Sequence, residues 1–97
     1  MKIQVTNEDI KKGEPGNCDN CAISQALKRY FKTNDTYTEI DDVTDDVLLT
    51  INNKKYKVNY KQEEDVRYFI SDFDMLGCDP YGYPEPDPIQ FDIEEIK

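Results

Sequence analysis

The segment of residues 17–32 constrains the fold more strongly than any other part of this sequence. Two cysteines at C-x-x-C spacing, Cys18 and Cys21, precede a run in which apolar residues recur at helical intervals. With about 100° of rotation per residue, one side of such a helix is apolar and carries Ala22, Ile23, Ala26, Leu27 and Tyr30. The other side is polar and carries Ser24, Gln25, Lys28 and Lys32. We therefore expect an amphipathic helix from about Cys21 to Lys32, with the rest of the chain covering its apolar side.

Other segments also have the patterns of regular structure. Apolar and polar side chains alternate in residues 47–51 and 55–60, on either side of Asn52 and Asn53, which predicts a hairpin with one apolar face and one lysine face. A second helix is expected over residues 62–76. Its apolar positions have the spacing of a core-facing stripe, with Val66, Phe69, Ile70 and Phe73.

Residues 1–5 and 89–93 alternate in the same way and are predicted to be the first and last strands. Thr6 is a suitable cap for one or two helical turns that Gly13 ends. This order of elements predicts an α+β fold in a single domain over residues 1–97. We expect a small, mostly antiparallel sheet of about four strands, with a central hairpin, packed against two helices.

The charge of the chain is unevenly distributed along the sequence. Residues 1–61 contain ten acidic and ten basic residues, whereas residues 62–97 contain eleven acidic residues and only Arg67 and Lys97 as bases. The whole net charge of −9 therefore belongs to the last third of the chain. Direct binding to nucleic acid is disfavoured, because it requires clustered positive charge. A partner protein with a basic surface is favoured, since long-range attraction accelerates such encounters.

Several classes of activity and location are disfavoured by the composition. The chain has no histidine, no glycine-rich phosphate loop and no Ser/His/Asp set, so we expect a non-enzymatic protein without a cofactor or a metal site. Three cysteines are an odd number, which argues against a disulfide scaffold. No apolar run is long enough to cross a membrane, and residues 1–5 lack the apolar core of a signal peptide. A cytoplasmic location is expected.

Acidic residues and loop tyrosines form the first candidate site. Residues 35–46 contain six acids and no Lys or Arg. One interpretation is a solvated loop, and the other is a set of carboxylates that competes with nucleic acid for the basic cleft of a nucleic-acid-binding protein. Tyr81 and Tyr83 lie in a proline-rich loop, where they either form an exposed contact or fold back on the sheet. The predicted partner-binding residues are Asp41, Asp42, Asp45, Asp46, Asp72, Asp74, Asp79, Tyr81, Tyr83, Glu85 and Asp87.

Basic residues of the hairpin form a second, alternative site. The hairpin carries lysines with tyrosines nearby. The favoured interpretation is a solvated hairpin face, and the alternative is a binding site for a small ligand that carries phosphate. In that alternative a homo-oligomer would sequester a nucleotide signal between its subunits. The residues assigned to it are Arg29, Lys54, Lys55, Lys57, Lys61 and Arg67.

The pair Cys18 and Cys21 allows three interpretations. The favoured one is a helix start at which the thiols pack or cap. A lowered thiol pKa at a helix N-terminus would permit redox chemistry. A metal site would need about four ligands, of which Cys78 is the one further thiolate.

Several short motifs are spread over most of the chain. They are Ile3-x-Val5-Thr6-x-Glu8-Asp9-Ile10-x-x-Gly13, the C-x-x-C pair that opens a helix, Arg-x-Phe-Ile-x-x-Phe-Asp from Arg67 to Asp74, and a last strand with Phe91. In these features the chain resembles a group of small bacteriophage and prophage proteins of uncharacterised function. Ala22 stands where those proteins commonly have proline. The resemblance implies a phage context and hence the cytoplasm of a host cell, but no activity.

The sequence favours a non-enzymatic phage-type protein that binds and inhibits a host macromolecule through an acidic surface. The target would be a defence protein or a nucleic-acid-processing protein. The alternatives are the oligomeric nucleotide sponge and a cysteine-based redox or metal-binding protein.

Overall fold

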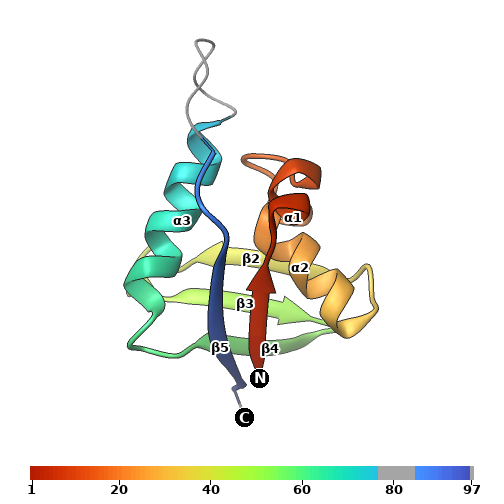
Figure 1. The fold of residues 1–97 in the computed structure, drawn as a ribbon. Coiled ribbons are helices and arrows are strands. Elements are labelled where there is room, and N and C mark those ends of the chain that lie inside the picture. Colours follow the sequence, from red (N-terminus) through yellow and green to blue (C-terminus); the bar gives the residue numbers. More distant parts are fainter. Residues whose placement is uncertain (77–84, 97) are drawn as a thin grey trace.

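The computed structural model describes residues 1–76 and 85–96 and confirms an α+β fold (Figure 1). In chain order the elements are β1 (Lys2–Val5), α1 (Asn7–Lys12), α2 (Ala22–Phe31), β2 (Thr36–Ile40), β3 (Val47–Ile51), β4 (Lys54–Val58), α3 (Glu63–Met75) and β5 (Ile89–Glu95). The strands form one sheet in the order β1-β5-β4-β3-β2, and every neighbouring pair is antiparallel. The sheet curls, and the helices lie on its inner side (Figure 1).

The last strand in the sequence is an interior strand of the sheet. β5 lies between β1 and β4, with Phe91 opposite Ile3 and Ile93 opposite Val58. The amino group of Met1 donates to the Ile93 carbonyl at 3.2 Å, and the Ile93 N–H donates back to the Met1 carbonyl at 2.8 Å. The first and last residues that the structure describes therefore lie close together (Figure 1).

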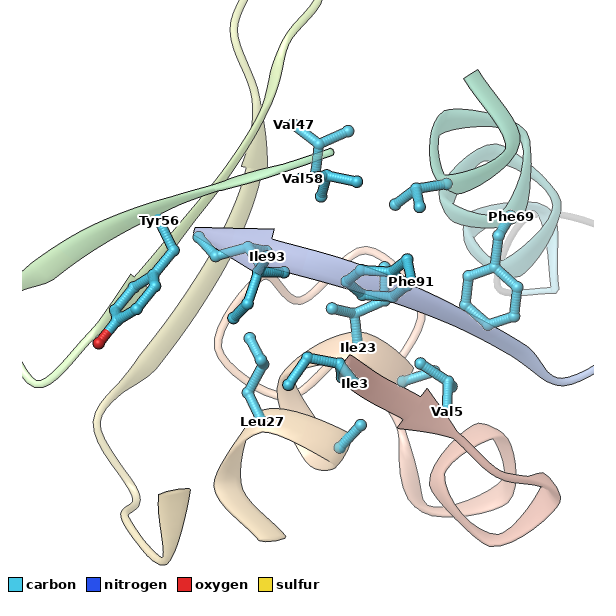
Figure 2. Close-up of a cluster of buried hydrophobic side chains, with 14 of the residues drawn as sticks. Ile3, Val5, Ile23, Leu27, Val47, Tyr56, Val58, Phe69, Phe91 and Ile93 are labelled. Carbon is cyan, nitrogen blue, oxygen red and sulfur yellow. The ribbon is translucent and has the colours of Figure 1, made fainter. Parts of the chain in front are cut away.

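The hydrophobic core lies between the inner face of the sheet and the helices α2 and α3. α2 contributes four apolar residues, which are Ala22, Ile23, Ala26 and Leu27, and α3 contributes Val66, Phe69 and Phe73. The strands supply their alternate residues, among them Ile3, Leu49 and Phe91. Figure 2 shows the Phe91 ring at the centre of this cluster, near Ile3 and Ile23.

Two local predictions are confirmed by the backbone. Asn52 and Asn53 form the tight turn of the β3–β4 hairpin with φ values of 52° and 66°, a conformation that asparagine tolerates better than most residues. Thr6 caps α1 in a reciprocal capping box with Asp9, and Gly13 ends the helix. The hairpin also has the predicted lysine face, because Lys55 and Lys57 are exposed whereas Tyr56 and Val58 are buried.

Within residues 1–76 and 85–96, the structure has one more strand and one more helix than the sequence predicted. β2 was missed because the residues that it buries, Thr36 and Thr38, are polar and give no apolar alternation. α1 has six residues and agrees with the one or two helical turns expected after Thr6, which were not counted among the two predicted helices. Three side chains were also assigned to the wrong environment: Ser24 is fully buried, whereas Tyr30 is 48% exposed and Tyr60 is 80% exposed.

The outer face of the sheet is not covered by a helix of the described residues. The side chains on this face alternate with the buried ones and carry both signs of charge. Lys2 lies opposite Asp92, and Lys57 lies opposite Glu94. In the part of the chain that the structure describes, no helix has the length and apolar character that a membrane span requires.

Candidate functional site

The outer side of α3 and the segment that leads into β5 enclose a groove of about 410 Å³. We call it the acidic groove. Its polar lining includes carboxylates from two separate segments, and no Lys or Arg is among the described residues that line it. The lining residues are Asp65, Tyr68, Phe69, Asp72, Glu85, Pro86, Asp87 and Ile89. Four negative side chains therefore face one concave surface.

An exposed tyrosine lies within this groove. Tyr68 is three residues after Asp65 and four before Asp72, so the three side chains share one face of α3. The Tyr68 side chain is 62% exposed, although the neighbouring Phe69 is buried in the core. A large aromatic surface that is held on a helix and flanked by carboxylates suits contact with a Lys or Arg side chain of another protein.

The acidic loop between β2 and β3 is tied down by hydrogen bonds of its own backbone. The Asp41 N–H donates to the Asp46 carbonyl at 2.8 Å, and Asp41 Oδ1 accepts from the N–H groups of Val43 and Thr44 at 2.8 and 3.1 Å. The hydrogen bonds from the backbone N–H groups lower the pKa of Asp41, and the bond from Thr44 has the largest effect. Val43 lies at the loop tip and is 92% exposed.

This loop lies beside the first turn of α3. Arg67 Nη1 donates to the Asp45 carbonyl at 3.1 Å and to Glu63 Oε1 at 3.2 Å. The pKa of Glu63 is raised, first by burial and then by a side-chain hydrogen bond with Asp46 and by the Asp46 charge. The positive charge of Arg67 acts in the opposite direction and lowers the pKa of Glu63. The Glu63 side chain is 14% exposed. The charge of Arg67 is thus engaged with acidic residues, and the start of α3 stays negative.

The pKa of Glu63 leads to a prediction for stability. A carboxyl group whose pKa is higher in the folded state binds more protons when folded, so its contribution to stability rises as the pH falls towards the unfolded pKa. Glutamine mimics the protonated group, so Glu63→Gln should raise the denaturation midpoint at pH 7 and lose this advantage near pH 4. Glu64→Gln, which removes the same charge from an exposed position, is the control. A Glu63→Gln protein that is less stable than the wild type at pH 7 would contradict the prediction.

The predicted acidic residues are distributed over several places. Asp72, Glu85 and Asp87 line the acidic groove, and Asp41, Asp42, Asp45 and Asp46 form the loop beside α3. Asp74 is elsewhere, because its Oδ1 accepts from the Gly16 N–H at 3.1 Å. Asp79, Tyr81 and Tyr83 lie outside the described residues. The sequence interpretation missed Asp65 and Tyr68, although their spacing to Asp72 on the polar side of the helix was a usable signal.

The predicted basic residues occupy separate parts of the molecule. Lys55 and Lys57 lie on the outer face of the sheet, and Lys54 begins the strand at the hairpin turn. Lys61 follows β4 and lies over the Tyr60 ring, with Nζ 5.9 Å from the centroid. Arg29 lies on α2, where Nη2 is 2.8 Å from Asp9 Oδ2, and Arg67 lies on α3.

The two cysteines lie where α2 begins. Cys21 caps the helix, with its Sγ accepting from the Ser24 N–H at 3.5 Å, as the favoured interpretation expects. The buried Ser24 hydroxyl donates to the Cys18 carbonyl at 2.6 Å and lies 2.8 Å from Thr38 Oγ1. The Thr38 N–H donates to the same carbonyl at 3.1 Å, so the C-x-x-C turn is fastened to the edge of β2.

Both thiols are free and line a pocket of about 170 Å³. The pocket also includes Ile40, Ile70 and Asp74. Among residues 1–76 and 85–96, no group of three or more metal-ligating side chains is gathered there or elsewhere. The observed contacts of Cys21 and Ser24 are those of a helix cap and its support.

No family model, curated protein or solved structure matches this chain. Its function has to be argued from the geometry and charge of its own surfaces. In the acidic groove, four carboxylates and an exposed tyrosine lie on one concave surface, and no Lys or Arg is among the described residues that line it.

Proposed function

We propose that this chain is a non-enzymatic, phage-type protein that binds and inhibits a host macromolecule through the acidic side of α3. The partner is a protein with a basic surface, of the defence or nucleic-acid-processing class. The acidic groove forms the contact, and the exposed Tyr68 lies within it. The β2–β3 loop lies on the other flank of α3, beside Arg67. The chain would act in the cytoplasm of the host cell.

The observation that carries this proposal is the convergence of carboxylates from distant parts of the sequence. Asp65 and Asp72 come from α3, whereas Glu85 and Asp87 come from the segment before β5. α3 has a single basic residue, Arg67, and this residue is paired with Glu63. A helix that only needed a solvated outer face would be served by mixed charges, as on the outer face of the sheet, where Lys57 lies opposite Glu94.

Recognition would combine electrostatic attraction with one aromatic contact. Carboxylates on a groove can occupy the positions at which a basic cleft normally binds phosphates, so that the partner cannot bind nucleic acid. Tyr68 would stack on a Lys or Arg side chain, and desolvation strengthens such a cation–π contact. Attraction over a long range would mainly accelerate association, whereas Tyr68 would slow dissociation.

Affinity capture from a host lysate with matched variants tests this proposal. The groove variant carries Asp65→Asn, Asp72→Asn, Glu85→Gln and Asp87→Asn. The control variant removes the same charge from four exposed positions elsewhere, with Glu8→Gln, Asp19→Asn, Asp35→Asn and Glu94→Gln. If each groove carboxylate contributes roughly 0.5 kcal/mol, the groove variant should bind the purified partner about 30-fold more weakly, and the control within about threefold of the wild type.

The salt dependence of binding provides the contradicting outcome. Salt screens the attraction between charges across an open groove, with a screening length of about 10 Å at 0.1 M salt. The affinity for the partner should therefore fall steeply when the salt concentration is raised from about 0.05 M to about 0.5 M. An affinity that stays constant over this range would contradict binding through the acidic groove. Equal losses in the groove and control variants would also contradict it, because they would point to net charge alone.

A further inference from the structure

We propose a second binding site, for a small phosphorylated molecule, in a pocket between α1 and α2. We call it the basic pocket. It measures about 360 Å³, and four of its lining residues are Lys or Arg. The lining residues are Asp9, Lys12, Gln25, Lys28, Arg29, Lys32, Thr33 and Asn34. This site is separate from the acidic groove and goes beyond the function proposed above.

Asp9, the one carboxylate among the described residues that line this pocket, is already engaged within the protein. Asp9 is 5% exposed, and its Oδ2 accepts from the Thr6 N–H at 2.9 Å and from Arg29 Nη2 at 2.8 Å. Lys12 and Lys32 are exposed, and the Arg29 side chain is 54% exposed. The surface that solvent meets in the pocket is therefore strongly positive, although the chain as a whole has a net charge of −9.

Helix stabilisation accounts for only part of this cluster. Lys28 and Arg29 lie in the last turn of α2, where positive charge suits the helix dipole. Lys12, however, belongs to a different helix, and it converges on the same pocket. Lys32 caps α2 in the left-handed conformation with φ 53°, which glycine would adopt at lower cost. An anion in the pocket is therefore attracted by positive charges from two helices.

The donors in the pocket fit phosphate oxygens. Arg29 uses Nη2 for Asp9 and the Gln4 carbonyl, and it keeps its other guanidinium nitrogens for a ligand. Lys28 donates to Asn20 Oδ1 and has two further N–H groups on its ammonium. Gln25 and Asn34 add neutral side-chain amide donors to the lining. Planar guanidinium and flexible ammonium groups together are the usual means of binding phosphate.

A small ligand suits the pocket better than a nucleic-acid backbone. The net charge of −9 repels a long polyanion, whereas a compact ligand experiences mainly the local positive field. The pocket volume of about 360 Å³ lies in the range of small-molecule sites and accommodates more than a lone phosphate. We therefore assign the pocket to a molecule with a phosphate or diphosphate group on a larger body, such as a nucleotide.

Titration of the full-length protein with inorganic pyrophosphate and with a nucleoside triphosphate tests this assignment. At low ionic strength we expect saturable binding by calorimetry. In NMR spectra, the amide signals of residues 12, 28, 29 and 32–34 should shift, while those of residues 65–72 should not. Absence of saturable binding for both probes, or shifts confined to other parts of the protein, would overturn the proposal.

Matched double variants locate the site. Lys12→Gln/Lys32→Gln removes two exposed charges from the basic pocket, and Lys55→Gln/Lys57→Gln removes two exposed charges from the outer face of the sheet. The first pair should weaken binding of the triphosphate at least tenfold, and the second less than twofold. The reverse order would place the ligand on the hairpin lysines and overturn the assignment to the basic pocket. Circular dichroism of all variants verifies that each one is folded.

A single-stranded oligonucleotide distinguishes a small ligand from a polymer. Tighter binding of the oligonucleotide than of the triphosphate would overturn the assignment to a small ligand. The groove variant provides an independent comparison, because it should bind the triphosphate at least as well as the wild type. Unchanged partner binding by the groove variant, with retained triphosphate binding, would thus refute the proposed function and leave the basic pocket standing.

Discussion

Replacing Phe91 with alanine is expected to lower the free energy of unfolding by about 3–5 kcal/mol, the largest effect of any substitution considered for this protein. Phe91 is 1% exposed and lies on β5, opposite Ile3 of β1. Its ring is near Ile23 of α2 as well (Figure 2). Truncation would leave a cavity where the sheet and the helix meet, and the rigid strands on both sides of β5 limit how far it can collapse.

Chemical denaturation monitored by circular dichroism measures this effect. Ile96→Ala is a suitable control, because Ile96 directly follows the same strand and is 43% exposed. The control should change the free energy of unfolding by less than about 0.5 kcal/mol. A Phe91→Ala protein within about 1 kcal/mol of the wild type would show that the core around β5 is not packed as described.

Replacing Gly13 with alanine should be the second most damaging change, at about 2–3 kcal/mol. A Cβ atom at this position would lie 2.6 Å from the Ala22 backbone nitrogen and 2.8 Å from Phe73 Cζ. The nearest atom belongs to the backbone at the start of α2, so no side-chain rotation relieves the contact. The variant must move α1 away from α2, which would also displace Lys12 from the basic pocket.

Gly16→Ala separates this steric effect from the general cost of replacing a glycine. Gly16 has a φ of 78°, but a Cβ atom there would meet nothing within 4 Å. Its replacement should cost only about 1 kcal/mol, which is the strain of a left-handed alanine. Thermal denaturation of both variants tests the order. A Gly16→Ala protein that is less stable than Gly13→Ala would contradict the close approach of α1 and α2.

The elements that local chemistry determines could be predicted from the sequence. The hairpin follows from Asn52 and Asn53, which supply two positive φ values between alternating strands. α1 follows from the reciprocal hydrogen bonds of Thr6 and Asp9, which need only four consecutive residues. The apolar stripe of α3 is also independent of the rest of the chain. In each case the residues that form the sequence pattern are the same neighbouring residues whose contacts form the element.

Elements that depend on contacts between distant residues could not be predicted. Thr38 is buried on β2 because its hydroxyl meets Ser24 and its N–H meets the Cys18 carbonyl. No periodicity of apolar residues signals such a polar contact. Tyr30 was placed on the buried side of α2, but the helix instead packs Phe31 against the core and leaves Tyr30 exposed.

The same distinction between local patterns and contacts of distant residues applies to the candidate sites. Asp65, Tyr68 and Asp72 lie on one helix and could have been grouped from their spacing. Glu85 and Asp87 join them only because β5 returns beside α3, which the sequence does not reveal. The basic pocket was likewise hidden, since Lys12 and Lys32 come together only when α1 folds against α2.

The position of β5 between β1 and β4 has a consequence for biosynthesis. While a ribosome is still producing the chain, β1 has been made but its partner strand has not, and the hydrogen bond between Met1 and Ile93 joins residues 92 positions apart. The nascent chain can form the β3–β4 hairpin and its helices early, but the sheet closes only after translation has passed Ile93. Until β5 has left the exit tunnel, Ile3 and Val5 therefore lack their strand partners Phe91 and Ile89.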